Sequence, residues 1–267
     1  MSRSLRFIFA FACSFFPLAT QAEFTVWDRT EEVVAGVPVF SENSLSITPT
    51  VAGTAGAVGV ISQHSVSSGK HYFESTTDCG PDSLGFAVGV ATSNPLLPSR
   101  PYLWSKGWAV ISDGLGLVNN SERYPNGRQS TVAGDVFMVA LDADEGHVFF
   151  GKNGVWLDSG DPSTGANPAF FGLPEKIFAA LEVGSRQCSD PLMTVTTNFG
   201  QSDFSYEVPT GYFKGFCADS NCPVAGPEVL NTFVNGEVAD ADRMNANFEL
   251  LLRRIESLEN RAKSSTR

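Results

Sequence analysis

Three acidic residues in one short stretch are the first candidates for chemistry. Asp142, Asp144 and Glu145 lie within Val132–Trp156. Paired carboxylates on a strand can hydrolyse glycosides, and clustered oxygen ligands can bind calcium. However, Asp142–Gly146 is the polar break between two apolar runs, and tight turns routinely select Asp and Gly. We therefore interpret the three acids as solvated turn residues, and keep a glycoside hydrolase and a calcium site as alternatives.

The rest of the sequence offers no catalytic constellation. Its three histidines are scattered at His64, His71 and His147, and we expect the last two to be partly buried strand residues. There is no Gly-x-Ser-x-Gly elbow, no His-Glu-x-x-His motif and no Gly-rich phosphate loop that opens a helix. We expect a protein that is not an enzyme and that has no cofactor and no metal.

The acids belong to a stretch whose pattern predicts three short antiparallel strands. Val136–Leu141 is a continuous apolar run, as in a strand buried on both faces, and His147–Gly151 is β-branched and aromatic. Asn153 and Gly154 then supply the two residues of positive φ that a two-residue hairpin turn needs, before Val155–Leu157 returns. Such a meander needs further strands and a second sheet to cover its apolar face.

Further strands are predicted along most of the chain. They fall at Phe24–Trp27, Ser44–Ile47, Trp108–Ile111, Ile177–Val183 and Met193–Phe199. Thr50–Gly59 is rich in Gly, Ala and Thr and predicts a mobile loop. The 25 Gly, 15 Pro and 21 Phe residues suit many short strands, tight turns and an aromatic core.

Four motifs follow one another in a recognisable order. They are SSGKHYFES (Ser67–Ser75), LGFAVGVATSNPLL (Leu84–Leu97), AGDVFMVALDADEGHVFFGKNGVWL and VTTNFGQSDFSYEVPTGY (Val195–Tyr212). Together they resemble the SPRY domain family, especially its bacterial and phage members, over roughly Trp27–Phe216. The resemblance implies an all-β fold, a two-sheet antiparallel concanavalin-like jelly-roll sandwich. It also implies a binding module without catalysis.

The best candidate for a recognition surface is the loop Ser93–Lys106. It carries Arg100, Tyr102 and Trp104, and aromatic residues and Arg on a stiff loop are typical of interface hot spots. Peptide-binding SPRY domains use the corresponding loop, including a Tyr, with residues just before the closing strand. By resemblance, those residues are Val183 and Gly184, although the Trp that some eukaryotic members have there is missing.

The resemblance therefore predicts a protein or peptide ligand, but the peptide specificity of the eukaryotic members is not carried over to this chain. A lectin-like protein that binds glycans is the alternative. Trp104 has a second interpretation too, as a loop residue folded onto the core.

The N-terminus has the features of a secretory signal peptide over residues 1–22. Arg3 and Arg6 precede the apolar run Leu5–Leu18, and small residues at Thr20–Ala22 offer a cleavage site. The alternative is a membrane anchor, but the run is about 14 residues long and a span needs about 20. We expect a secreted, periplasmic or cell-surface protein that is not inserted in a membrane after cleavage.

The chain that would remain is strongly acidic. Cleavage removes two arginines, which leaves 16 basic residues against 29 acidic ones and a formal charge of −13. This charge disfavours nucleic acid and anionic membranes as partners. The remaining 245 residues allow one large β domain at residues 23–216, a Pro-bearing linker at 217–230 and a tail at 231–267.

Four cysteines would remain after export, an even number that predicts two disulfides with three possible connectivities. We favour Cys217–Cys222, which closes a small loop, and Cys79–Cys188, in which each residue lies just past a predicted strand. A zinc site is the alternative, but there is no Cys-x-x-Cys spacing and no nearby His.

The tail has a heptad pattern that predicts one C-terminal α-helix and a coiled coil. Apolar residues recur at alternating steps of three and four from Ala241 to Ala262. The residues expected to hold a homo-oligomer together are Met244, Phe248, Leu251, Ile255 and Leu258. The alternative is a helix that docks on its own sandwich. The sequence does not specify the number of helices in the coil or the identity of the ligand.

Overall fold

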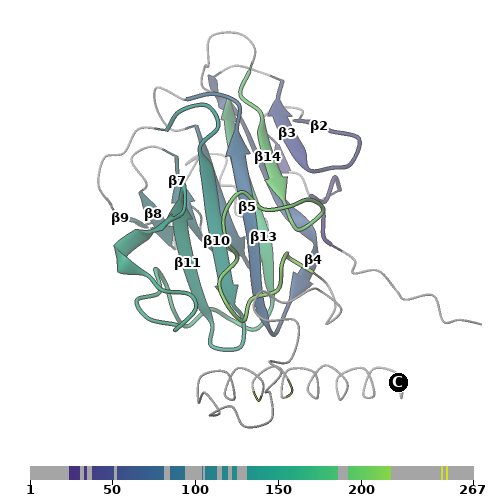
Figure 1. Cartoon of the computed structure of the whole chain (residues 1–267). Helices are drawn as coiled ribbons and strands as arrows, with labels where there is room; N and C mark the ends of the chain where they lie inside the picture. The colour runs from purple at the N-terminus through teal and green to yellow at the C-terminus, as the bar shows by residue number, and fades with distance from the viewer. Residues whose placement is uncertain are drawn as a thin grey trace, which may run out of the picture.

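Two antiparallel sheets of seven strands each, packed face to face, form the body of the protein in a computed structural model (Figure 1). The fold class predicted from the sequence is confirmed. The structure describes residues 24–30, 33–34, 38–50, 53–80, 85–93, 104, 106–112, 116–119, 122–124, 131–185, 192–217, 248 and 251.

The first sheet has the strand order β1-β4-β13-β6-β7-β8-β9. Its strands are β1 (Val33–Val34), β4 (Gly53–Val66), β6 (Phe86–Ala91), β7 (Gly107–Ile111), β8 (Leu117–Asn119), β9 (Glu122–Tyr124) and β13 (Ile177–Ser185). The strands β6 and β13 are buried over almost their whole length, so they form a rigid centre for this sheet.

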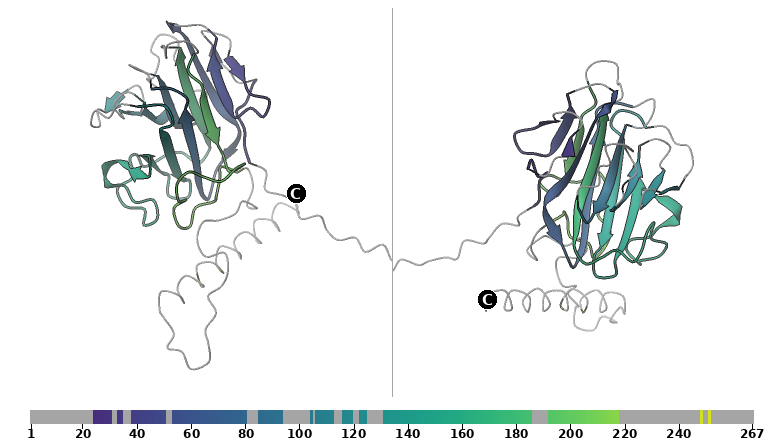
Figure 2. Two further views of the ribbon diagram at one scale, coloured as in Figure 1. Left: turned by 45° about the horizontal axis from the view of Figure 1, so that its top comes forward. Right: turned by 180° about the vertical axis from the view of Figure 1, so that it is seen from behind.

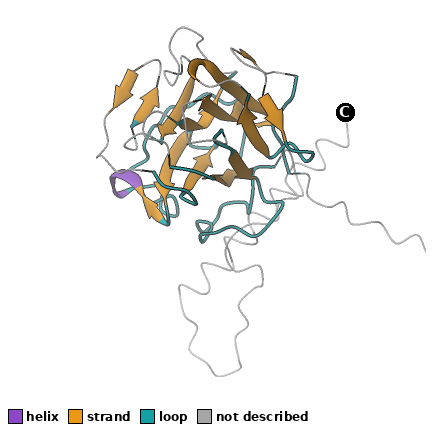
Figure 3. Cartoon of the chain, turned by 90° about the horizontal axis from the view of Figure 1, so that it is seen from above, coloured by secondary structure: helices purple, strands orange, loops and turns teal. Residues whose placement is uncertain are grey.

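The second sheet has the strand order β12-β11-β10-β5-β14-β3-β2. Its strands are β2 (Pro38–Phe40), β3 (Ser46–Pro49), β5 (Lys70–Thr77), β10 (Val136–Asp142), β11 (His147–Lys152), β12 (Val155–Trp156) and β14 (Val195–Asn198). Figure 2 shows the two sheets from behind and from a tilted view. Seen from above, the short 3-10 helix η1 (Leu157–Ser159) lies at the side of the sandwich (Figure 3).

The meander predicted from the sequence is confirmed at β10, β11 and β12. All seven residues of β10 are buried, as its continuous apolar run predicted. Asn153 and Gly154 have φ angles of 49° and 81°, so they form the predicted tight turn with two residues of positive φ.

The prediction of a mobile loop at Thr50–Gly59 is wrong for Gly53–Gly59, because these residues begin strand β4. They pair with β13, from Gly53 opposite Ser185 to Gly59 opposite Glu182. Gly and Ala are depleted in strands, so composition alone favoured a loop. Pairing along the whole of β13 overrides that local preference.

The main core lies between the two sheets and is strongly aromatic. Trp27 and Phe199 meet edge to face with ring centroids 4.9 Å apart, and Phe86 and Phe137 do so at 4.8 Å. These four side chains are almost fully buried. Because successive residues of a strand point to opposite faces, each sheet also has an outer face that must be covered.

Both outer faces carry apolar clusters of their own. On the first sheet the cluster contains Ile61, Ala87, Ala91, Trp104, Ala109, Ile111, Val118 and Ala180. On the second sheet it contains Tyr72, Met138, Ala140, Phe149 and Tyr212. The segment 204–212 crosses the second of these faces, since Ser205 and Tyr206 each donate a backbone hydrogen bond to the Glu74 carboxylate of β5, at 2.8 and 2.9 Å.

Several predicted segments lie outside the described residues. They are the signal peptide at 1–22, the linker apart from Cys217, and the tail at 231–267 apart from Phe248 and Leu251. These two residues are helical and 60% and 40% exposed. In the described part of the chain, no helix has the length and apolar character needed to span a membrane.

Candidate ligand-binding site

The loop between β6 and β7 is anchored on the outer face of the first sheet by Trp104. The Trp104 side chain is fully buried, and its Nε1–H donates a 2.9 Å hydrogen bond to Oε2 of Glu182 in β13. Its ring lies against Gly107, where an added Cβ would come within 2.8 Å of Trp104 Cε3. The C-terminal part of the loop is therefore fixed to two strands of the sheet.

The strand register shows how far this anchor reaches. Gly107 pairs with Ala91, at the end of the sheet where β6 ends and β7 begins. Glu182 pairs with Ala87, four residues further along β6, beside the pair formed by Val183 with Phe86. Trp104 thus connects one end of the first sheet to residues close to its other end.

Three of the predicted ligand-binding residues are not surface residues in this structure. Trp104 and Val183 are 0% exposed, Val183 in the main core, and Gly184 is buried with its N–H bonded to the Gly85 carbonyl at 2.7 Å. In this structure the three residues are therefore buried, and their part in ligand binding stays a prediction. Arg100 and Tyr102 lie outside the described residues, so their contact with a ligand stays a prediction.

Sequence reasoning missed Glu182. The structure places this carboxylate at 0% exposure, as the partner of the Trp104 indole. The signal was present, since Glu182 interrupts the apolar strand Ile177–Val183 that the sequence predicted. An acidic residue within a buried strand requires a hydrogen-bond donor, and Trp offers one at its ring nitrogen.

Asp142 and Asp144, in the β10–β11 turn, each have a partner for the side chain. Asp142 is buried at the end of β10 and forms a 3.0 Å ion pair with Lys70, so its assignment as a solvated residue is corrected. The exposed Asp144 accepts a hydrogen bond from the Gly69 N–H at 2.8 Å. Across the described ranges, no three His, Cys, Asp or Glu side chains form a group that could hold a metal ion.

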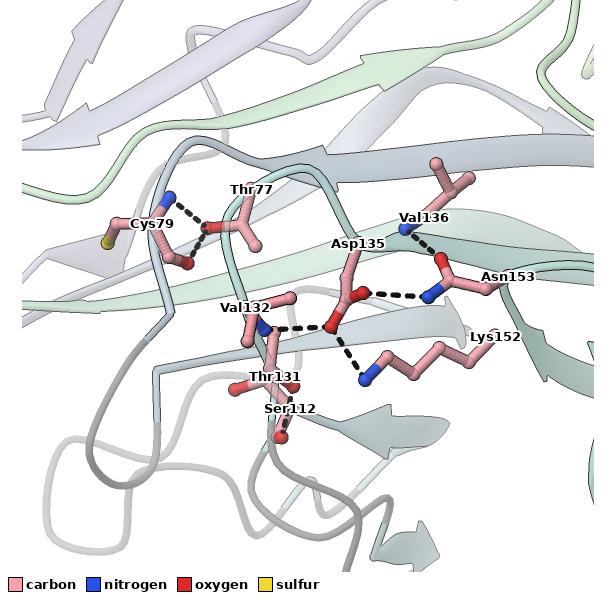
Figure 4. Close-up of polar contacts among 9 residues, drawn as sticks. All are labelled: Thr77, Cys79, Ser112, Thr131, Val132, Asp135, Val136, Lys152 and Asn153. Atoms are coloured by element: carbon pink, nitrogen blue, oxygen red, sulfur yellow. Dashed lines mark hydrogen bonds and ion pairs between the residues drawn. The ribbon is translucent and has the colours of Figure 1, made fainter.

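A buried ion pair fixes the opposite end of the second sheet, where β10 begins (Figure 4). Nζ of Lys152 lies 2.6 Å from Oδ2 of Asp135, and both side chains are less than 10% exposed. Asp135 also accepts hydrogen bonds from the Asn153 side chain at 2.7 Å and the Val132 N–H at 2.8 Å. Burial alone would raise the pKa of Asp135, but the hydrogen bonds from Lys152, Asn153 and Val132 lower it overall.

The same end of the sandwich carries Cys79, just after β5. The Thr77 hydroxyl donates to the Cys79 carbonyl at 2.9 Å, and Asp78 exchanges hydrogen bonds with Thr194 (Figure 4 shows the first contact). Cys79 and Cys217 are both disulfide-bonded. Cys188 and Cys222 lie outside the described residues, so the pairs Cys79–Cys188 and Cys217–Cys222 stay predictions.

His71 is the buried titratable residue with the clearest consequence for stability. It is 2% exposed in β5, its Nε2–H donates to the Ser68 carbonyl at 2.8 Å, and the rings of Phe213 and Phe216 lie about 5 Å away. Burial lowers the pKa of His71 to about 4, despite the Ser68 carbonyl and the nearby Asp144 and Asp142.

We expect the free energy of unfolding to fall by about 3 kcal/mol from His71 alone as the pH drops from 6.5 to 4. The unfolded chain binds a proton over this range and the folded chain does not, so the stabilisation is complete only above pH 6.5. Urea unfolding at several pH values should show a weaker pH dependence for His71→Gln than for the parent. His64→Gln is the matched control, and equal slopes for all three proteins would contradict the assignment.

Comparison with known proteins agrees with this geometry. The family model of the SPRY domain matches residues 70–193. The fold is similar to that of the SPRY domain of human HERC1, with a TM-score of 0.50 and 18% identity over 66% of this chain and 99% of that one.

Two further solved structures are also similar. A human SPRY domain has a TM-score of 0.46 and 14% identity, over 62% of this chain and 97% of that one. The TRIM65 PSpry domain has a TM-score of 0.43 and 17% identity, over 67% and 93%. No curated protein sequence matches the chain. The fold is a two-sheet antiparallel β-sandwich similar to that of SPRY domains, and residues 70–193 match the model of that family.

Proposed function

We propose that this chain is an exported, non-catalytic binding module that recognises a protein or peptide segment through the loop Ser93–Lys106. The observation that carries the proposal is the fixing of this loop by the buried Trp104–Glu182 hydrogen bond. Fixing one end of a loop reduces the conformational entropy that the loop loses on binding, which favours affinity.

The match to the SPRY domain supports the class of ligand, because SPRY domains are interaction modules that bind proteins. The chemistry of the loop supports it as well. Arg100 and Tyr102 precede the anchor by four and two residues, and these two residue types are enriched in interface hot spots. The acidic chain, with a formal charge of −11, favours a basic or neutral segment over an acidic one.

Export and assembly are part of the proposal. The half-cystines at Cys79 and Cys217 fit an oxidising compartment. Phe248 and Leu251 are exposed on a helical segment, as expected of heptad positions that await a second copy. Several copies of a weak site would bind a surface with avidity.

The full chain should have the solution mass of an oligomer, and a chain that ends at Pro227 should have the mass of a monomer. The same oligomeric state for both chains would remove assembly from the proposal.

The binding surface is tested with peptides selected on the full chain from a random peptide library. We expect Tyr102→Ala to weaken their binding about tenfold or more, and Arg100→Ala to weaken it as well, because hot-spot truncation costs more than about 1 kcal/mol. The matched control is Phe171→Ala, which removes a 77% exposed aromatic side chain elsewhere on the sandwich. Unchanged calorimetric affinities for both loop variants would contradict the proposed surface.

A further inference from the structure

A pocket of about 390 Å³ lies on the outer face of the second sheet, away from the Trp104 loop. Its lining comes from three places: the β10–β12 meander, the turn at Ser163 and the segment that crosses this face. The lining residues are Met138, Gly154, Trp156, Ser163, Tyr206, Glu207, Val208, Pro209 and Thr210. The volume is in the range of about 300–1,000 Å³ that is usual for small-molecule sites.

The crossing segment is held on both sides of the pocket. On one side, the Glu74 carboxylate accepts the N–H groups of Ser205 and Tyr206. On the other side, the Phe213 N–H donates to the Lys70 carbonyl at 2.7 Å. Residues 207–210 therefore bridge between two fixed points, and the pocket beside them is a built feature of the fold.

The turn opposite the crossing segment is also fixed. The Asp161 carboxylate accepts the Ser163 N–H at 3.0 Å and the Thr164 hydroxyl at 2.7 Å. The Ser163 hydroxyl in turn accepts the Thr210 N–H at 3.2 Å, which connects the turn to the crossing segment. Both walls of the pocket are thus tied to each other and to the sheet.

The lining combines aromatic surfaces with hydrogen-bonding groups. Trp156 and Tyr206 are half-buried, and the Tyr206 ring packs on Gly154, where an added Cβ would come within 2.8 Å of it. Ser163 and Thr210 provide hydroxyl groups that can donate and accept, and Glu207 provides an exposed carboxylate that accepts. None of the lining residues is Lys or Arg, so the lining offers no charge partner to an anionic ligand.

From this lining we infer that the pocket binds a neutral saccharide unit. The apolar C–H face of a sugar ring packs on aromatic side chains, while its hydroxyl groups both donate to a carboxylate and exchange hydrogen bonds with Ser and Thr. Glu207 would accept from sugar hydroxyls, with Trp156 and Tyr206 as the apolar walls. This inference stands apart from the proposed peptide-binding loop, because the two sites lie on outer faces of different sheets.

The test uses the full chain and four probes: the methyl glycosides of glucose, mannose, galactose and N-acetylglucosamine. Saturation-transfer NMR should detect at least one of them, with Glu207→Gln weakening that binding about tenfold or more. Glu175→Gln is the matched control, since Glu175 is exposed and does not line the pocket. Trp156→Phe, which keeps an aromatic ring, should weaken binding while leaving the melting temperature close to that of the parent.

Three results would overturn the inference. The first is no signal with any of the four glycosides. The second is binding that Glu207→Gln and Trp156→Phe leave unchanged. The third is binding of tetramethylammonium but of no glycoside, which would assign the pocket to an organic cation. In each of these cases Tyr102→Ala should still weaken the binding of the selected peptides. Failure of the saccharide inference is therefore distinguishable from failure of the proposed peptide site.

Discussion

Replacing Asp135 with Ala is expected to lower the free energy of unfolding by about 3–5 kcal/mol, because it removes one partner of a buried ion pair. Asp135 and Lys152 are 7% and 8% exposed at the side chain and lie 2.6 Å apart. The same carboxylate holds the Asn153 side chain and the Val132 N–H, so two hydrogen bonds that fix the start of β10 are lost with it.

Urea unfolding of Asp135→Ala and Asp135→Asn separates the charge from the hydrogen bonds. The Asn variant keeps an acceptor of similar shape, so it should lose less stability than the Ala variant. Glu175→Ala, at an exposed position, is the control and should change stability by less than about 0.5 kcal/mol. A loss below about 1 kcal/mol for Asp135→Ala would mean that the ion pair does not hold this end of the sandwich.

Replacing Trp104 with Ala is the second change with a large expected effect, a loss of about 3–5 kcal/mol. It deletes a fully buried ring from the cluster on the outer face of the first sheet and removes the donor to the buried Glu182 carboxylate. Because the ring also holds the β6–β7 loop, binding of selected peptides should weaken more than the loss of folded protein explains.

Trp104→Phe is the variant that tests the anchor without emptying the core. It retains most of the buried ring and loses the indole N–H, with an expected cost of about 1–3 kcal/mol from the desolvated carboxylate. Folded Trp104→Phe should bind selected peptides more weakly than the parent. Equal affinity in the folded variant would show that the Trp104–Glu182 bond does not position the loop.

The part of the fold with strong local signals was predictable from the sequence. The apolar run Val136–Leu141 predicted a buried strand, and Asn153 with Gly154 predicted a tight hairpin turn; the structure has both. The ordered motifs then predicted the SPRY-type sandwich.

Features that depend on partners distant in sequence were not predictable in the same way. The strand at Gly53–Gly59 pairs along its length with β13, which follows 120 or more residues later in the sequence. The buried Asp142 forms its ion pair with Lys70, which lies opposite it on the neighbouring strand β5 and is 72 positions earlier in the sequence. Local composition carries no information on either contact.

The sequence predicted which loop is the candidate site, but it did not predict the contact that fixes this loop to the sheet. From its residue type, Trp104 could equally be a ligand contact or a core residue. In the structure it is fully buried against the sheet. Its partner Glu182 was visible only as an acid in an apolar strand, because it lies 78 positions after Trp104 and no local pattern connects the two residues.

The most direct test of the central claim is hydrogen–deuterium exchange on the full chain with and without a peptide selected from the random library. We expect bound peptide to slow exchange in residues 92–106, and we expect this protection to disappear in Tyr102→Ala. Protection confined to residues 204–212, or to the edge strands β2 and β9, would contradict the claim that the β6–β7 loop is the binding surface.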